Sequence, residues 1–278
     1  MRIALAQLSS STDPAENLEM VGVYARRAAA AGAELVVFPE ATMCSFARSS
    51  RDVAEPFDGP WAAAVRGIAR ELGIAVVAGM FTAADDGRVH NTLLVTGPAE
   101  ARYDKIHLFD ALGFRESDHI APGGRPVTVD VAGTRVGLAT CYDVRFPGLF
   151  TALAQAGADL ILVCASWAPG PQKVHQWRTL ATARAMDSTT FVVAVGQAAA
   201  SPVDEPGRPT GVGHSLAVDP TGTVLLELGE RPELALVDIE PGLVADVRAH
   251  LPVLHHAASL AEPQRQPSPE GLPSDRPG

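Results

Sequence analysis

The sequence predicts an α/β domain in which mixed β-sheets are layered with helices. Apolar runs typical of strands alternate with helical patterns along most of the chain. Several runs, such as 160–164, are apolar throughout, which favours strands buried on both faces. Short strands joined by turns follow near the end, and they indicate hairpins within a mixed sheet.

The first half of the chain begins with a strand at 3–8. The next helix starts at Asp13, a capping carboxylate, with Pro14 in the first helical position and Glu16 three residues after the cap. It ends at Gly32, where a left-handed backbone costs little. The other elements expected up to residue 140 are strands at 34–38, 74–79, 91–96, 102–108, 127–131 and 136–140, and a helix from Gly59 to Gly73.

The second half continues the alternation and then changes to hairpins. We expect helices at 147–156, 172–187 and 242–250, strands at 160–164, 190–196, 213–218, 224–228 and 234–239, and a turn at 219–222. Residues 1–257 are predicted to form one domain. Residues 258–278 are predicted to be a disordered tail, because this part of the chain is rich in proline and poor in apolar residues.

The composition excludes several classes of protein. The 278 residues are 47% hydrophobic and 19% charged, as in a packed globular protein. A formal net charge of −10 without a Lys/Arg run argues against a nucleic-acid or anionic-membrane partner. Three cysteines without close spacing form neither a disulfide framework nor a zinc cluster. With no run long enough to span a bilayer and no signal peptide, we expect a cytoplasmic protein.

Three polar side chains follow predicted strands at the point where each strand ends. Glu40 follows 34–38, Cys141 follows 136–140 and Ser166 follows 160–164. Ligands of open α/β sheets bind in the crevice beyond the carboxyl ends of the strands. These three residues are therefore candidates for a common site.

Cys141 is the candidate nucleophile, because a strand–Cys–turn–helix arrangement exposes the sulfur near backbone N–H groups. Cys44 and Cys164 are interpreted as small buried hydrophobic residues. A thiol needs a base or a nearby cation, and no histidine is placed to serve Cys141. Glu40, at the mouth of the expected cleft, is the better base, since burial would raise its pKa into a useful range.

Two further charged residues are ambiguous when each is taken alone. Lys105 lies within the predicted strand 102–108, where lysine is most often an edge-strand charge. The alternative is an inward-facing ammonium that stabilises an oxyanion. Glu116 resembles an ordinary surface charge. Neither residue by itself indicates a function.

Together these residues resemble the nitrilase superfamily of carbon–nitrogen hydrolases, over residues 1 to about 254. The resemblance depends on six separated blocks in the right order. They are Arg2–Gln7, Val36–Glu40, Tyr103–Phe109, Cys141–Pro147, Gly213–Ser215 with Asp219–Gly222, and Val247–Pro252.

The resemblance implies a role for each residue. Glu40 would be the general base, Lys105 the oxyanion-stabilising cation, Cys141 the nucleophile and Glu116 a second glutamate near the lysine. The backbone N–H of Tyr142 would be a second oxyanion donor. The family fold is a four-layer α-β-β-α sandwich, normally assembled as a homodimer or larger oligomer, and neither metal nor organic cofactor is implied.

The sequence departs from the family pattern at two positions. Gly148 stands where relatives with this cysteine motif commonly have Glu. Gln176 precedes Trp177 where many have His, which leaves the contacts on that side of the pocket open.

The cysteine block and the closing segment look most like the small-amide amidases, omega-amidase and deaminated glutathione amidase. An amide with a distal carboxylate needs a cation, and Arg145 is the nearest candidate, unless it forms an ion pair with Asp143. Ser166 and Trp167 are expected in a pocket wall formed by the loop 166–171.

Five other functions compete with a small-amide hydrolase. A nitrilase or an N-carbamoyl amine hydrolase would use the same four residues, and a non-catalytic binding protein of this fold is a third alternative. A metallohydrolase is disfavoured because the histidines are scattered, and a dinucleotide-binding oxidoreductase because no Gly-x-Gly-x-x-Gly follows the first strand.

Overall fold

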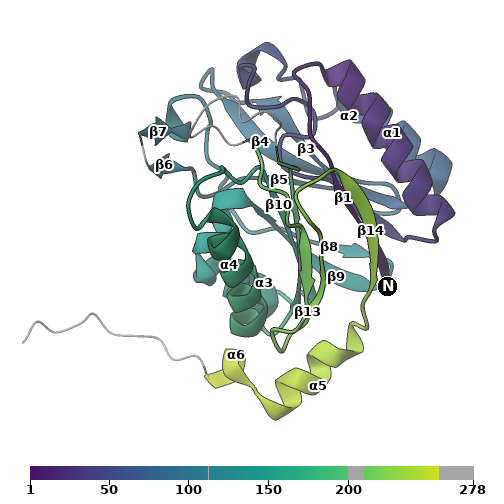
Figure 1. The fold of residues 1–278 in the computed structure, drawn as a ribbon, viewed down its shortest axis with the longest axis vertical. Coiled ribbons are helices and arrows are strands. Elements are labelled where there is room, and N and C mark those ends of the chain that lie inside the picture. Colours follow the sequence, from purple (N-terminus) through teal and green to yellow (C-terminus); the bar gives the residue numbers. More distant parts are fainter. Residues whose placement is uncertain (112, 200–209, 257–278) are drawn as a thin grey trace, which may run out of the picture.

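Two six-stranded sheets are stacked face to face, and a pair of helices covers the outer face of each (Figure 1). The computed structural model describes residues 1–111, 113–199 and 210–256. The helices and sheets form four layers in the order α-β-β-α, as the resemblance to the nitrilase superfamily implies. The predicted tail, 258–278, lies outside the described residues.

The first sheet has the strand order β14-β1-β2-β3-β4-β5. Its strands β1, β2 and β3 run parallel, and the flanking strands are antiparallel to them. The strands of this sheet are β1 (Arg2–Gln7), β2 (Leu35–Val37), β3 (Ala75–Ala83), β4 (Val89–Thr96), β5 (Ala101–Asp104) and β14 (Glu233–Asp238).

The second sheet has the order β13-β12-β11-β10-β9-β8 and again contains three parallel strands, β9, β10 and β11. A hairpin of β6 (Asp110–Ala111) and β7 (Phe114–Arg115) stands apart from both sheets. The strands of the second sheet are β8 (Thr128–Val131), β9 (Thr134–Thr140), β10 (Leu160–Ala165), β11 (Phe191–Gly196), β12 (Leu216–Val218) and β13 (Val224–Glu227).

The helices begin and end at the predicted signals. The Asp13 carboxylate accepts a hydrogen bond from the Ala15 N–H at 2.9 Å, and Gly73 closes α2 in the left-handed conformation. Helices α1 and α2 pack on the first sheet, and α3 and α4 on the second. The helices are α1 (Pro14–Ala30), α2 (Pro60–Leu72), α3 (Pro147–Gln155), α4 (Lys173–Ser188), α5 (Gly242–His250) and α6 (Val253–His256).

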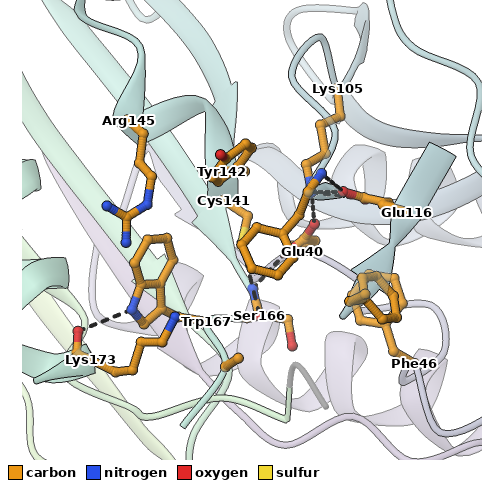
Figure 2. Close-up of a pocket in the computed structure, with 13 residues that line it drawn as sticks. Glu40, Phe46, Lys105, Glu116, Cys141, Tyr142, Arg145, Ser166, Trp167 and Lys173 are labelled. Atoms are coloured by element: carbon orange, nitrogen blue, oxygen red, sulfur yellow. Dashed lines mark hydrogen bonds and ion pairs between the residues drawn. The ribbon is translucent and has the colours of Figure 1, made fainter. Parts of the chain in front are cut away.

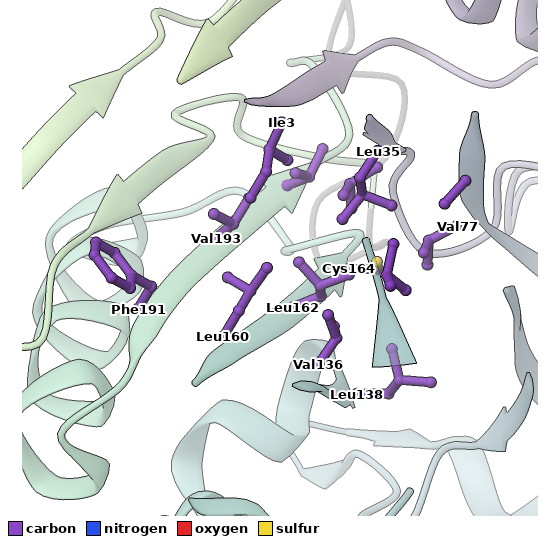
Figure 3. Close-up of a cluster of buried hydrophobic side chains, with 14 of the residues drawn as sticks. Ile3, Leu35, Val77, Val136, Leu138, Leu160, Leu162, Cys164, Phe191 and Val193 are labelled. Carbon is purple, nitrogen blue, oxygen red and sulfur yellow. The ribbon is translucent and has the colours of Figure 1, made fainter. Parts of the chain in front are cut away.

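The main hydrophobic core lies between the two sheets (Figure 3). Ile3, Leu35 and Val77 of the first sheet face side chains of the second such as Leu138 and Leu162. The other faces of the same strands pack on helices, so these strands are apolar at nearly every position. Each fully buried side chain of this size contributes about 1.5–3 kcal/mol, so the sheets are held as a rigid base for the loops at their ends.

Most predicted strands differ from the structure by one or two residues at an end, and three differ by more. β12 begins at Leu216, so the first half of the predicted strand 213–218 is wrong. β5 ends at Asp104, so the second half of the predicted strand 102–108 is wrong. The backbone leaves the ladder there because the Lys105 carbonyl accepts a hydrogen bond from Gly123 and the His107 N–H donates to the Asp143 carboxylate. β3 instead continues to Ala83, beyond the predicted end at residue 79.

No helix within the described residues combines the length and the apolarity needed to cross a bilayer.

Candidate active site

Glu40 lies in a tight turn that follows β2 and packs directly against β3. The next residue, Ala41, has a φ of 58°, in the left-handed region. A Cβ atom on Gly79 of β3 would lie 2.6 Å from the Ala41 nitrogen and 2.8 Å from the Pro39 carbonyl oxygen. Only glycine at residue 79 leaves room for this turn, so β3 helps to fix where the Glu40 side chain points.

The Glu40 carboxylate is almost completely buried, with 1% of the residue exposed. One oxygen, Oε1, accepts hydrogen bonds from Asn91 Nδ2 at 2.7 Å and from Lys105 Nζ at 3.1 Å. The other, Oε2, accepts the Ser166 backbone N–H at 2.7 Å. Burial raises the pKa of Glu40, Lys105 opposes that rise and Glu116 adds to it. A carboxyl group in this environment is suited to receiving a proton and giving it back.

Lys105 lies just beyond β5, with its ammonium held between two carboxylates. Nζ donates to both Glu116 oxygens at 2.9 Å and to Glu40. Burial alone would lower the pKa of Lys105, but the negative charges of Glu116 and Glu40 hold it well above its ordinary value. The ammonium therefore stays protonated across the neutral range. Its interpretation as an edge-strand charge is wrong, because Lys105 is 2% exposed and outside the strand.

Glu116 is likewise not the surface charge that its local sequence resembles. It is 5% exposed and opens a short 3-10 helix, Glu116–Asp118. Its Oε2 also accepts the Phe109 backbone N–H at 2.7 Å, so the carboxylate is fixed from two sides. Glu116 thereby orients the lysine towards Glu40.

Cys141 follows β9 and has a φ of 49°, an uncommon conformation for a residue with a side chain. It begins the 3-10 turn Cys141–Arg145, which leads into α3. Burial raises the pKa of the thiol well above its ordinary value, the Glu40 charge raises it further, and Lys105 partly opposes this. The resting cysteine is a thiol, so its proton must be removed as it reacts.

Asp143 joins the segment around Lys105 to the turn that carries Cys141. Its Oδ2 accepts hydrogen bonds from Tyr103 Oη at 2.6 Å and from the Thr140 N–H at 2.8 Å. Its Oδ1 lies 2.7 Å from His107 Nδ1. Tyr103 and His107 lie on either side of Lys105 in the sequence, so this hydrogen-bond network fixes the position of Lys105 relative to Cys141. Sequence reasoning gave Asp143 no such role.

All eight residues predicted for the site line one pocket (Figure 2). The deep end contains Glu40, Lys105, Glu116 and Cys141, and the remaining four, Tyr142, Arg145, Ser166 and Trp167, lie around them. The pairing of Arg145 with Asp143 does not occur: Arg145 Nη2 donates to Gln176 Oε1 at 2.6 Å instead. The lining also includes Ala168 of the predicted wall loop 166–171, and four residues that the sequence did not indicate, namely Phe46, Phe109, Phe114 and Lys173.

The comparisons with known proteins agree with this geometry. A family model described as Carbon-nitrogen hydrolase matches residues 2–249. Hydrolase Rv0480c of Mycobacterium tuberculosis is 54% identical over 94% of this chain and 97% of its own length. A deaminated glutathione amidase of Escherichia coli O157:H7 is 33% identical over 95% of this chain and 99% of its own.

A solved structure adds a likeness in three dimensions. It is a variant of the amidase from Nesterenkonia sp. AN1, in which acrylamide has undergone Michael addition at the active-site cysteine. The TM-score is 0.73 at 30% identity, over 90% of this chain and 98% of that one. The predicted resemblance to the nitrilase superfamily and to amidases of this type is confirmed.

Proposed function

Because this chain belongs to the carbon–nitrogen hydrolase family, we propose that it cleaves the C–N bond of a small linear amide and releases ammonia and a carboxylic acid. The domain 1–257 carries this reaction, and Cys141 forms a thioester intermediate. The observation that supports this most strongly is the meeting of Glu40, Lys105, Glu116 and Cys141 at one end of one pocket.

The first half of the reaction is attack by sulfur on the amide carbonyl carbon. Glu40 removes the thiol proton as the C–S bond forms, because the raised pKa of Cys141 leaves little thiolate beforehand. The carbonyl oxygen gains negative charge, which the Lys105 ammonium and the Tyr142 N–H stabilise. Losing one donor of this kind typically costs about 10²–10³ in rate.

The second half returns the proton and removes the acyl group. Protonated Glu40 gives its proton to the departing nitrogen, so that the C–N bond breaks and ammonia leaves. Glu40 then takes a proton from water as the water oxygen attacks the thioester carbon. The C–S bond breaks, the thiol regains its proton from Glu40, and the carboxylic acid is released.

Substrate binding is proposed for the rest of the pocket wall. Tyr142, Arg145, Ser166 and Trp167 surround the space above the thiol. An amide is favoured over a nitrile or an N-carbamoyl amine by the similarity to two amidases.

The test is ammonia release from a panel of small amides, nitriles and N-carbamoyl amines, with Cys141→Ala and Glu40→Gln as controls. We expect turnover of amides, none by Cys141→Ala, and a fall of about 10²–10⁴ for Glu40→Gln. Activity on nitriles alone, or full activity of Cys141→Ala, would overturn the proposal. A non-catalytic binding protein would release no ammonia from any of them and would show no preferential alkylation of Cys141 by iodoacetamide at neutral pH.

We also propose that the enzyme works in the cytoplasm as a homodimer or larger homo-oligomer. The three cysteines, Cys44, Cys141 and Cys164, are free thiols, which suits a reducing compartment. Met186 and Leu251, which are 52% and 58% exposed, both line a groove between α4 and α5. Exposed apolar side chains along one groove suit association between copies of the chain. Sedimentation analysis of the purified chain tests the assembly: a monomer at micromolar concentration would contradict it.

A further inference from the structure

Asn91, in β4, lies behind the pocket and contacts both Glu40 and Lys105. The residue is completely buried and is not part of the pocket lining. Its side-chain Nδ2 donates to Glu40 Oε1 at 2.7 Å, and its backbone carbonyl accepts the Lys105 N–H at 2.9 Å. One residue therefore holds the proposed base through its side chain and the proposed oxyanion donor through its main chain.

The shortest hydrogen bonds to Glu40 come from neutral donors. Lys105 Nζ lies 2.9 Å from both Glu116 oxygens but 3.1 Å from Glu40, so the ammonium favours Glu116 (Figure 2). The Asn91 amide and the Ser166 backbone N–H each reach Glu40 at 2.7 Å. These two donors, one on each carboxylate oxygen, do most to fix the orientation of the Glu40 side chain.

The charges around Glu40 favour its protonation. Two carboxylates, Glu40 and Glu116, share the single ammonium of Lys105, so the cluster has one negative charge in excess. Burial and the Glu116 charge raise the pKa of Glu40, whereas Lys105 lowers it. The hydrogen bond from Asn91 also lowers the pKa of Glu40, because it stabilises the ionised form. Asn91 thus opposes the uptake of a proton before the reaction begins.

The other titratable groups that interact with Glu40 in the described part of the chain are two thiols, Cys141 and Cys164. Burial raises the pKa of each, so neither carries a charge at neutral pH. The Ser166 carbonyl lies 3.9 Å from Cys141 Sγ, while the N–H of the same residue donates to Glu40. The carboxylate that Asn91 holds is therefore beside the nucleophile.

The other polar atom of the Asn91 side chain, Oδ1, is buried without a hydrogen-bond partner among the residues that the structure describes. The amide cannot be reversed, since an amide oxygen 2.7 Å from the Glu40 carboxylate would be repelled. An unpaired buried acceptor destabilises a fold, and leucine, which has a similar size, would have none. Asparagine at this position therefore lowers stability while it donates one hydrogen bond to Glu40, as expected of a functional residue.

We propose that Asn91 is a positioning residue for the reaction, which holds the Glu40 carboxylate ionised and in place before the substrate arrives. This inference rests on the proposed amide hydrolysis, in which Glu40 must be free to accept the thiol proton. A neutral donor suits this task, because it stabilises the carboxylate without a second positive charge that would oppose its later protonation. Asn91 acts through Glu40 and lines no part of the substrate pocket.

The kinetic test is the pH profile of kcat/KM for Asn91→Leu. Glutaramide is the substrate, because it has no group that titrates near the acidic limb, unlike its anionic analogue glutaramate. Loss of the donor raises the pKa of Glu40, so the base becomes protonated at a higher pH. We expect the acidic limb to move up by about one pH unit, which lowers kcat/KM about tenfold below the limb. The Tm should stay the same or rise, since the unpaired Oδ1 is also removed.

Two further variants separate this effect from a general disturbance of β4. Thr92→Val removes a different buried hydrogen bond of the same strand, to Asp104 at 2.6 Å, and should leave the acidic limb in place. Asn91→Asp keeps the shape of the side chain but replaces the donor with a second carboxyl group, so the limb should again move to higher pH. This variant also tests the inference if Asn91→Leu does not fold. An unmoved limb in a folded Asn91 variant, or an equal loss at every pH, would overturn the inference.

Alkylation of Cys141 by iodoacetamide gives a second pH profile that needs no amide turnover. The rate, followed by mass spectrometry of the Cys141 peptide, should fall as Glu40 takes up a proton, and Asn91→Leu should move this limb to higher pH by the same amount. A moved alkylation limb without any ammonia release would support the role of Asn91 and count against the proposed hydrolysis. Hydrolysis of amides with both limbs unmoved would overturn the inference and leave the proposed hydrolysis standing.

Discussion

The two ends of the pocket are built differently. At the deep end, Glu40, Lys105 and Glu116 are each at most 5% exposed, and every charge faces an opposite charge at 2.9–3.1 Å. At the wide end, Arg145 and Lys173 are partly exposed, contact aromatic faces and lack a carboxylate partner in the described chain. The deep end is complete without substrate, whereas the wide end keeps a positive charge that no carboxylate of the described chain offsets.

The difference separates two tasks. A reacting group needs to be placed before the substrate arrives, because misplacement by about 1 Å can cost 10²-fold in rate. A side chain that recognises a charged substrate contributes most to specificity when only the bound substrate neutralises its charge. We therefore expect changes at the deep end to lower kcat for every amide, and changes at the wide end to raise KM for anionic amides alone.

The largest effect should come from disturbing the deep end without touching a charge. Gly79→Ala places a methyl group against the backbone of the Glu40 turn, so the turn must move. We expect kcat to fall about 10²-fold for glutaramate and glutaramide alike. The free energy of unfolding should also fall, by about 1–3 kcal/mol, measured by urea denaturation.

Gly67→Ala in α2 is the matched control. Its Cβ would meet nothing within 4 Å, so it should keep full activity and gain up to about 1 kcal/mol in stability. Full activity of a folded Gly79→Ala variant would show that the position of the Glu40 turn is less critical than the packing indicates.

A smaller effect, with a pH signature, is expected for Glu116→Gln. The Glu116 charge raises the pKa of Glu40, and Glu116 also shares the Lys105 ammonium with it. Removing that charge lowers the pKa of Glu40, so the acidic limb of the kcat/KM profile should move to lower pH. Glu40 becomes a weaker base and the ammonium loses a charged partner, so kcat should fall about 10- to 100-fold. An acidic limb that stays in place or moves to higher pH would contradict the assignment of Glu40 as the base.

The two ends also differ in how far the sequence could predict them. Glu40, Cys141 and Ser166 follow apolar strands whose ends are marked by proline or by a turn, so their common location could be predicted locally. The sequence predicts a strand that includes Lys105 and continues to residue 108, but the chain leaves the sheet after Asp104, and the His107 N–H donates to Asp143. No local pattern encodes that contact, which spans 36 residues.

Glu116 and Lys173 show the same limit. The burial of Glu116 depends on a lysine eleven residues away, and the family resemblance indicated it where the local pattern did not. Lys173 is the first residue of α4, and its location at the pocket follows from how this helix packs on the second sheet. The fold follows from patterns along the chain, whereas the charge balance of the pocket depends on contacts between distant segments.

The smallest expected effect tests the wide end alone. Gln176→Ala removes the hydrogen bond at 2.6 Å that holds the Arg145 guanidinium but leaves its charge in place. We expect KM for glutaramate to rise about 2- to 10-fold, since one such bond contributes about 0.5–1.5 kcal/mol net. Its kcat should stay unchanged, and glutaramide kinetics should not respond. Equal falls in kcat for both substrates would instead mean that Gln176 supports the Cys141 turn, and the division between a reacting end and a recognition end would no longer hold.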